Sequence, residues 1–382
     1  MRDASSGFRS VIADLNDGRR EARMAWSARW RRLPRHARTG IAVLGVAALY
    51  VVPFTKPPLL NTPDVDLISL LGTSVVPYVL AALGLNVVVG LAGMLDLGYV
   101  GFYAIGAYSV GILTTEHASL PWLLALPASV LITMAFGVAL GSPTLRLRGD
   151  YLAIVTLGFG EIIRISAQNF EWLGAAEGIS GIERPPSIGP FKFSALQNGS
   201  YWIFGLTLIL VVMYLLRRIE ESRVGRAWTA IREDEDAAEL MGVPTFRFKL
   251  WAFAIGAAVG GLAGAFYAGK NITIYPADFE IANSILFLAA VVLGGPGNMW
   301  GVALGGFAIA YLPERFRFIA DKRYLVFGAA LVLMMIFRPQ GLLPRRQRAE
   351  ELLHGEVRTS LPALGGADAA QVPISEAGPR DD

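Results

Sequence analysis

The stretch ISLLGTSVVPYVLAALGLNVVVGLA (residues 68–92) contains 25 consecutive residues without a charged side chain. As an α-helix rising about 1.5 Å per residue it would be roughly 37 Å long. That length exceeds the hydrocarbon core of a bilayer, which is about 30 Å thick. Apolar residues lie on every side of such a helix, so no continuous polar face remains for water. The stretch therefore predicts a helix that crosses a membrane.

The same pattern recurs along the chain. Hydrophobic residues make up 54% and charged residues 17% of its 382 residues, whereas a soluble domain carries roughly 25% charged residues. We predict an all-α, polytopic integral membrane protein, embedded in membrane lipid, with about ten transmembrane helices. The apolar segments are 40–54, 68–92, 97–115, 121–141, 150–167, 201–216, 250–269, 282–295, 299–312 and 324–337.

Several kinds of function are excluded by composition. The chain has no cysteine, so disulfides, zinc–thiolate sites and cysteine nucleophiles are absent. Its net charge of +3 comes from basic residues beside the apolar segments, which does not indicate nucleic-acid binding. The sequence has no G-x-x-x-x-G-K-[ST] phosphate loop, and its three histidines are far apart. We predict no enzymatic activity, no cofactor and no metal.

Lysine and arginine are unevenly distributed between the predicted loops. One set of loops carries 25 of these residues and the other set carries 8, with Arg164 inside a span. The basic side of a membrane protein is normally cytoplasmic, and an even number of spans places both termini there. The cytoplasmic segments are then 1–39, 142–149, 217–249 and 338–382. If residues 282–312 instead formed one long or re-entrant element, the basic loop 313–323 would change side.

This topology divides the chain into three parts. Residues 1–39 form a basic cytoplasmic N-terminal extension, and residues 40–344 form the transmembrane domain. Residues 345–382 form a cytoplasmic tail, whose Ala, Gly, Pro and Asp content is typical of disorder. The transmembrane domain carries a cytoplasmic loop (217–249) and a Gly/Pro-rich extracytoplasmic loop (168–200).

Two segments resemble each other within the chain. GLNVVVGLAGMLDLGYVGFYAIGAYSVG (84–111) and AAVVLGGPGNMWGVALGGFAIA (289–310) share a β-branched run, a glycine-rich break and a Gly/Ala-rich helix. Transporters commonly contain repeats with broken helices near the solute path. Similar membrane composition without a repeat would also give this pattern.

The cytoplasmic loop contains GRAWTAIREDEDAAELMGVPTFRFK (225–249), which is far longer than a membrane hairpin needs. The run from Arg232 to Asp236 is charged, and Gly242 followed by Pro244 is a helix stop. A narrow stripe of small and apolar residues is formed by Ala227, Ile231, Ala238 and Met241. The pattern predicts a short helix that docks in a groove on a soluble partner. A solvated helix at the membrane surface is the alternative.

Polar residues inside spans are the usual markers of a transport path. Glu161 lies eleven residues into its span, about 16 Å from the inner end, where Arg164 can pair with it on the same helix face. Asp96 precedes a helix and is a candidate N-cap. The candidate path residues are Asn86, Asp96, Tyr99, Phe102, Tyr103, Thr156 and Glu161. Each of them has an alternative structural role, as a helix bridge, an ion pair or a packed aromatic ring.

Four motifs in order along the chain resemble the permease subunits of bacterial ABC importers for branched-chain amino acids. They are GLAGMLDLGYVGFYAIGAYSVGIL (90–113), GDYLAIVTLGFGEIIRI (149–165), GRAWTAIREDEDAAELMGV (225–243), and VVLGGPGNMWGVALGG (291–306) with FRPQGLLP (337–344). The resemblance covers about residues 60–345. It is greatest to the larger permease subunit of this family, which carries an N-terminal extension.

The resemblance implies a pore-forming subunit in the bacterial cytoplasmic (inner) membrane. Its partners would be a second, related permease in a heterodimer, two cytoplasmic ATPases and an extracytoplasmic substrate-binding protein. The resemblance assigns the cytoplasmic loop to coupling with the ATPases, with Ala237 and Ala238 allowing close approach and Arg232 and Glu233 pairing with the partner. The implied coupling residues are Gly225, Arg226, Ala227, Arg232, Glu233, Ala237, Ala238 and Gly242.

Branched-chain or other small apolar amino acids are the substrates that the resemblance implies. The same family type also resembles permeases for urea, short amides and aromatic acids. An ion-coupled secondary transporter is an alternative of a different class, with Glu161 or Asp96 binding the proton or Na⁺. Such a transporter would need no ATPase-docking loop. A membrane-embedded enzyme fits least, because no catalytic spacing of His, Asp and Glu is present.

Overall fold

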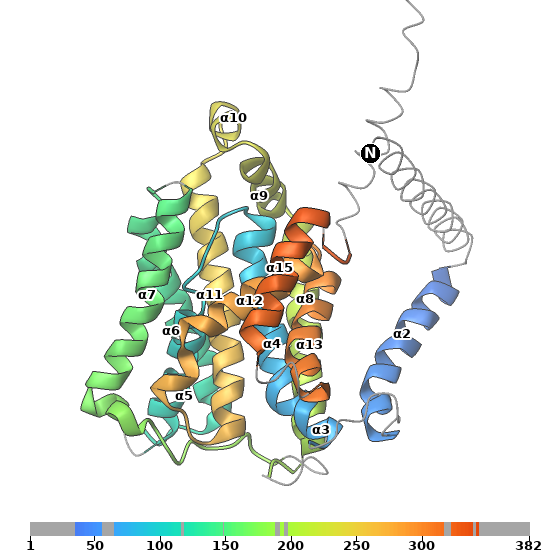
Figure 1. The fold of residues 1–382 in the computed structure, drawn as a ribbon, viewed down its shortest axis with the longest axis vertical. Helices are drawn as coiled ribbons and strands as arrows, with labels where there is room; N and C mark the ends of the chain where they lie inside the picture. Colours follow the sequence, from blue (N-terminus) through green and yellow to red (C-terminus); the bar gives the residue numbers. More distant parts are fainter. Residues whose placement is uncertain are drawn as a thin grey trace, which may run out of the picture.

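The computed structural model describes residues 35–55, 65–115, 118–147, 149–187, 192–194, 198–316, 322–338 and 341–343. Within these ranges the regular structure is helical, apart from one isolated bridge between Ile179 and Ile274. Most long helices run roughly along the long axis of the molecule (Figure 1). The all-α prediction is therefore confirmed for the described part of the chain. Most of the N-terminal extension and the whole tail after residue 345 lie outside it.

Helices occur where the apolar segments predict them. The second segment is continuous through two π-helical stretches, because α3 (Leu67–Leu70), η3 (Leu71–Val75), α4 (Val76–Leu85) and η4 (Asn86–Leu91) follow one another directly. The others are α2 (Arg35–Val51), α5 (Val100–Thr114), α6 (Trp122–Thr144), α7 (Asp150–Asn169), α8 (Asn198–Glu220), α11 (Thr245–Asn271), α12 (Ile281–Gly294), α13 (Met299–Arg315) and α15 (Arg323–Phe337).

Four helical stretches are long and apolar enough to cross a membrane by length and composition: 67–91, 122–144, 198–220 and 245–271. Helices α5 and α12 are shorter, with 15 and 14 residues. At 1.5 Å per residue they reach only about 20–23 Å, less than a full hydrocarbon core. The structure thus supports a multi-pass membrane protein, while the count of ten spans and the side of the termini stay predictions.

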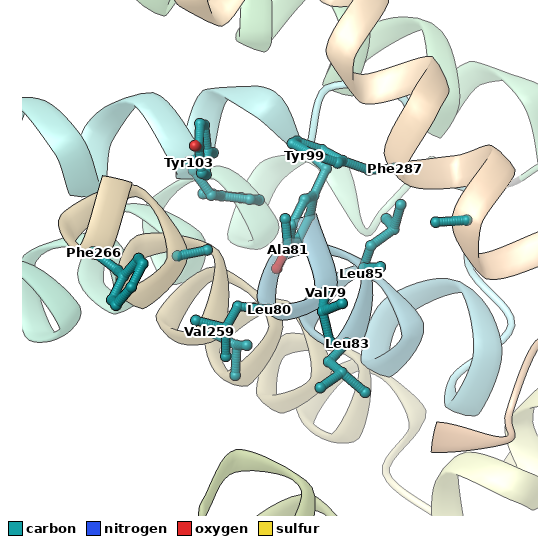
Figure 2. Close-up of a cluster of buried hydrophobic side chains, with 14 of the residues drawn as sticks. Val79, Leu80, Ala81, Leu83, Leu85, Tyr99, Tyr103, Val259, Phe266 and Phe287 are labelled. Atoms are coloured by element: carbon teal, nitrogen blue, oxygen red, sulfur yellow. The ribbon is translucent and has the colours of Figure 1, made fainter. Parts of the chain in front are cut away.

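The core is built around α11, which packs against α4, α5 and α6. Figure 2 shows side chains from α4, α5, α11 and α12 meeting in one apolar cluster, including Leu80, Tyr99 and Phe287. Glycines allow the close approach: a Cβ on Gly264 would lie 1.9 Å from the Tyr103 carbonyl oxygen. Gly256, Gly260 and Gly264 repeat every four residues along α11, and their close contacts form a packing seam.

Both predicted breaks between helices are present. Residues 92–99 return from the end of η4 into the interior before α5 begins (Figure 1), and residues 295–298 separate α12 from α13. The Gly297 N–H donates to Asn86 Oδ1 at 2.9 Å, and the Val100 N–H donates to Ser284 Oγ at 2.8 Å. One hydrogen bond therefore joins the second break to η4 in the first segment, and the other joins the start of α5 to α12.

The two long loops lie at opposite ends of the bundle. Residues 217–249 contain the short helices α9 (Arg223–Glu233) and α10 (Glu235–Leu240), which stand at one end (Figure 1). The described residues of the loop 168–200 lie at the other end, where Ile179 pairs with Ile274 just after α11. This arrangement agrees with the predicted topology, in which the two loops are on different sides of the membrane.

Labelling of single cysteines gives a direct test of sidedness, because the chain has none of its own. Ser180 and Ala230 are both exposed, one at each end of the bundle. We expect a membrane-impermeant maleimide to label the Ser180→Cys variant in intact cells. The Ala230→Cys variant should react only after the cells are permeabilised. The reverse pattern would invert the topology.

Candidate functional site

Helix α9 forms the base of the cytoplasmic loop. Ser222 is its N-cap and accepts a hydrogen bond from the Val224 N–H at 3.1 Å. One face, which includes Ala227 and Ile231, is buried against the bundle. Trp228 is fully buried, and its indole N–H donates to the Phe248 carbonyl at 2.7 Å. This contact fixes α9 to the start of α11.

The loop is not one helix, as the sequence stripe suggested, but two. Asp234 has extended backbone (φ −156°, ψ 110°), which ends α9. Its Oδ1 then accepts the Ala237 N–H at 2.9 Å and caps α10. Because the chain turns at Asp234, residues on either side of it no longer share one helix face. The prediction of a single stripe running from Ala227 to Met241 is therefore wrong.

The end of α10 presents an apolar pair to the surroundings. Leu240 is 88% exposed and Met241 is 85% exposed, whereas Ala238 is only 5% exposed. Gly242 follows with φ +85°, a left-handed conformation that suits glycine and ends the helix. Figure 1 shows α10 projecting beyond the ends of the long helices. We call Leu240 and Met241 the apolar tip.

The predicted coupling residues divide into an exposed and an inward-facing set. Arg226, Glu233, Ala237 and Gly242 are exposed and lie within reach of a partner. Gly225, Ala227 and Ala238 are buried in this chain and pack inside it, and their role in coupling stays a prediction. Gly225 is needed at a tight turn, because a Cβ there would lie 2.1 Å from the Glu220 carbonyl oxygen.

Arg232 also points into its own chain. Its guanidinium donates to the carbonyl oxygen of Gly90, in the π-helical end of the second span. Its stem lies against Gly93, where a Cβ would be 2.7 Å from Arg232 Cγ. Gly93 has φ +76°, so a side chain there would be strained as well as crowded. Arg232 therefore links α9 to the first broken helix, and its pairing with an ATPase stays a prediction.

A second polar contact secures α10. Lys249, near the start of α11, is 6% exposed and forms an ion pair with Glu235. This pair and Arg232 border a cavity of about 190 Å³ beneath the loop, which is also lined by Met94 and Asp150. The cavity places the loop, the first break and the start of α7 around one space.

The polar residues of the predicted path mostly hold the breaks together. Thr156 Oγ1 accepts the Leu97 N–H at 3.1 Å and donates to the Ala153 carbonyl. Asp96 Oδ1 accepts the Gly98 N–H at 2.9 Å, whereas α5 begins only at Val100. The predicted helix N-cap at Asp96 is therefore corrected to a cap of the turn before the helix.

Two buried polar atoms in this region have no hydrogen-bond partner among the described residues: Asn86 Nδ2 and Asp96 Oδ2. Tyr99, Phe102 and Tyr103 lie nearby and are buried. The Tyr99 hydroxyl donates to the Gly256 carbonyl at 2.7 Å, and the Tyr99 and Phe102 rings pack edge to face. These aromatic residues are part of the packed core in this conformation, as the structural alternative predicted.

Glu161 lies apart from the other path candidates. It pairs with Arg164 on α7, as the sequence predicted, with Arg164 Nε 3.0 Å from both carboxylate oxygens. The pair is on an outward-facing surface of the bundle, not beside Asp96. The structure thus brings Asn86, Asp96, Tyr99 and Thr156 together around the two breaks and leaves Glu161 outside.

Sequence reasoning did not assign roles to Trp228, Asp234, Leu240 and Lys249. For Trp228 the signal was a tryptophan beside small residues in a charged loop. For Asp234 the signal was an aspartate, a residue type that favours helix N-caps, just before the helix-forming run 235–240. The exposure of Leu240 and the Lys249–Glu235 pair had no local signal. They depend on how α10 folds back on α11.

These features define a helical, multi-pass membrane protein with broken helices and an ordered loop at one end. The family model described as the branched-chain amino acid transport system / permease component matches residues 67–336. The chain belongs to this family, which confirms the resemblance found in its motifs.

Several relatives are similar over most of the chain. The high-affinity branched-chain amino acid transport system permease protein LivM of Salmonella typhimurium is 40% identical over 337 residues, covering 82% of this chain and 78% of the relative. BraD of Pseudomonas aeruginosa, a permease protein of the same description, is 31% identical over 290 residues, covering 70% of this chain and 92% of the relative. The permease protein LivH of Salmonella typhimurium is 27% identical over 284 residues, covering 70% of this chain and 91% of the relative. No solved structure matches the chain.

Proposed function

We propose that this chain is the permease subunit of an ABC importer for branched-chain or other small apolar amino acids in the bacterial inner membrane. The family and the names of the relatives support the transport of such amino acids. The energy would come from ATP hydrolysis by separate subunits that dock on the cytoplasmic loop. In this proposal residues 40–344 form the membrane domain, with residues 1–39 and 345–382 in the cytoplasm.

The observation that carries this proposal is the apolar tip on its rigid base. Leu240 and Met241 are more exposed than the other large hydrophobic residues of the described loop, and the loop lies at the end of the bundle that the charge distribution makes cytoplasmic. An exposed apolar pair at the tip of a projecting helix is suited to contact with a partner protein. The base is fixed by Trp228, Arg232 and the Lys249–Glu235 pair, so a force on the tip would be transmitted to the breaks.

The proposed partners are a second permease, two ATPases and an extracytoplasmic binding protein. Similarity to both LivM and LivH of one organism supports a pair of related permeases. The binding protein would dock at the opposite end, around the loop 168–200. Urea, short amides and aromatic acids remain alternative substrates of the same scaffold, because the binding protein would contribute much of the selectivity.

Reconstitution separates this proposal from an ion-coupled transporter. The purified chain alone should accumulate no leucine in liposomes, with or without a proton or Na⁺ gradient. Liposomes that contain the complete importer should accumulate radiolabelled leucine when binding protein is outside and ATP is inside, and a non-hydrolysable analogue should abolish this. Accumulation by the isolated chain on an ion gradient would establish the secondary transporter instead.

A further inference from the structure

The outward surfaces of the bundle are apolar almost everywhere at membrane depth. Among the described helices other than α9 and α10, only α7 has partly exposed charged side chains more than one turn from its ends. These are Glu161 and Arg164. By contrast, exposed residues of α6 and α15 include Leu123, Leu124, Leu131, Phe136, Leu325 and Ile336. One face of the molecule therefore differs chemically from the others.

In the predicted topology, the charged pair on α7 would lie near the middle of the membrane. Glu161 is eleven residues from the start of the helix, or about 16 Å at 1.5 Å per residue. Arg164 Nε is 3.0 Å from both carboxylate oxygens, and the two side chains keep 25% and 29% of their surface exposed. The chain itself thus neutralises the pair without burying it.

Helix α7 also fails to resemble a lipid-facing helix in composition. It has 20 residues, enough to span, but is not among the four helical stretches that are apolar enough to cross a membrane. Helix α6 is among them, and only 22% of its apolar window is buried. Charges at the bilayer centre are costly and normally face protein or water. The face of α7 with Glu161 is therefore unsuited to lipid.

The rest of that face is suited to a close protein contact. Ile162 is 62% exposed and follows Glu161 directly. Gly158 lies one helical turn before Ile162, on the same face of α7. A Cβ on Gly158 would have no atom within 4 Å, so its small size is not required by packing inside this chain. A small residue next to exposed apolar ones allows another helix to approach closely.

We propose that the second permease subunit packs on this face of α7 and covers Ile154, Gly158, Glu161, Ile162 and Ile165. The partner would supply polar groups opposite the Glu161–Arg164 pair and an apolar contact around it. This inference rests on the proposed function, because it requires a paired permease. Similarity of the chain to two permeases of one organism favours a related subunit over a second copy of this chain.

Photo-crosslinking in membranes that contain the whole importer tests the face. Benzoylphenylalanine is placed at Ile162 or, as control, at Leu131 on α6. The two positions are 62% and 60% exposed, and they lie 12 and 13 residues from the predicted cytoplasmic ends of their helices, so their depths match. Irradiation should join the second permease, identified by mass spectrometry, to position 162 and not to position 131.

Leucine uptake is measured in the cells from which these membranes come. It separates the proposed α7 interface from the proposed function of the importer. Normal uptake with no adduct at position 162, with an adduct to a second copy of this chain, or with equal adducts at both positions would overturn the α7 interface but leave the importer intact. If the unmodified importer showed no ATP-dependent uptake, the proposed function itself would fail.

A substitution at Gly158 tests the same interface through co-purification of the second permease. Gly158→Trp has room within this chain, so the protein should reach the membrane, but the indole should keep the partner helix away. We expect the co-purified second permease to fall roughly tenfold or more, the change that about 1.4 kcal/mol produces. Leu131→Trp should leave its amount unchanged. Full recovery of the partner with Gly158→Trp would show that α7 faces something else.

Discussion

Replacing Leu240 and Met241 together with aspartate is expected to abolish leucine uptake and the co-purification of the ATPase. Burial of a leucine or methionine side chain contributes about 1.5–3 kcal/mol, so losing two such contacts weakens docking by roughly a hundredfold or more. The charges add a desolvation cost at the same contact. The amount of the permease in the membrane should stay near normal, because both side chains are almost fully exposed in this chain.

The matched control exchanges the two residues, with Leu240→Met and Met241→Leu. It keeps the apolar surface of the tip, and swaps of this kind usually cost less than about 1.5 kcal/mol even in a packed core. Uptake and ATPase recovery should therefore stay close to those of the unchanged importer. If the aspartate variant transported normally, the apolar tip would be a solvated feature and the ATPase would have to dock elsewhere.

The positions of the helices could be predicted because membrane helices need long stretches without charge. The apolar segments could be predicted for that reason, and the two breaks could be predicted from their glycine content. The Glu161–Arg164 pair could be predicted because it depends only on spacing along one helix. A local rule was sufficient wherever the contact was between residues a few positions apart.

The direction of the loop side chains could not be read from the sequence. A periodic stripe assumes one continuous helix, but Asp234 caps a new helix and changes the register. Ala238 consequently turns inward, and the apolar tip turns outward. Arg232 finds its acceptor at Gly90, 142 residues earlier in the chain. Long-range contacts of this kind leave no periodic signal in a single sequence.

Replacing Arg232 is expected to have a different effect from replacing the apolar tip. Because Arg232 faces Gly90 rather than the surroundings, Arg232→Ala should leave the ATPase attached and its hydrolysis measurable. It removes the guanidinium that links α9 to the first break and leaves a carbonyl without its charged donor, at a cost of about 1–3 kcal/mol. Movement of the loop would then no longer reach residues 92–99.

We therefore expect Arg232→Ala to reduce leucine uptake by roughly tenfold or more, since about 1.4 kcal/mol of lost coupling corresponds to one factor of ten. ATPase recovery should stay near normal. Arg223→Ala is the control, because Arg223 lies on the same helix but is exposed and is not among the predicted coupling residues. Uptake and hydrolysis are measured on the same proteoliposomes, so that their ratio reports coupling directly. Loss of the ATPase from the Arg232→Ala complex would make Arg232 a docking residue, and an unchanged ratio would show that the link to Gly90 carries no motion.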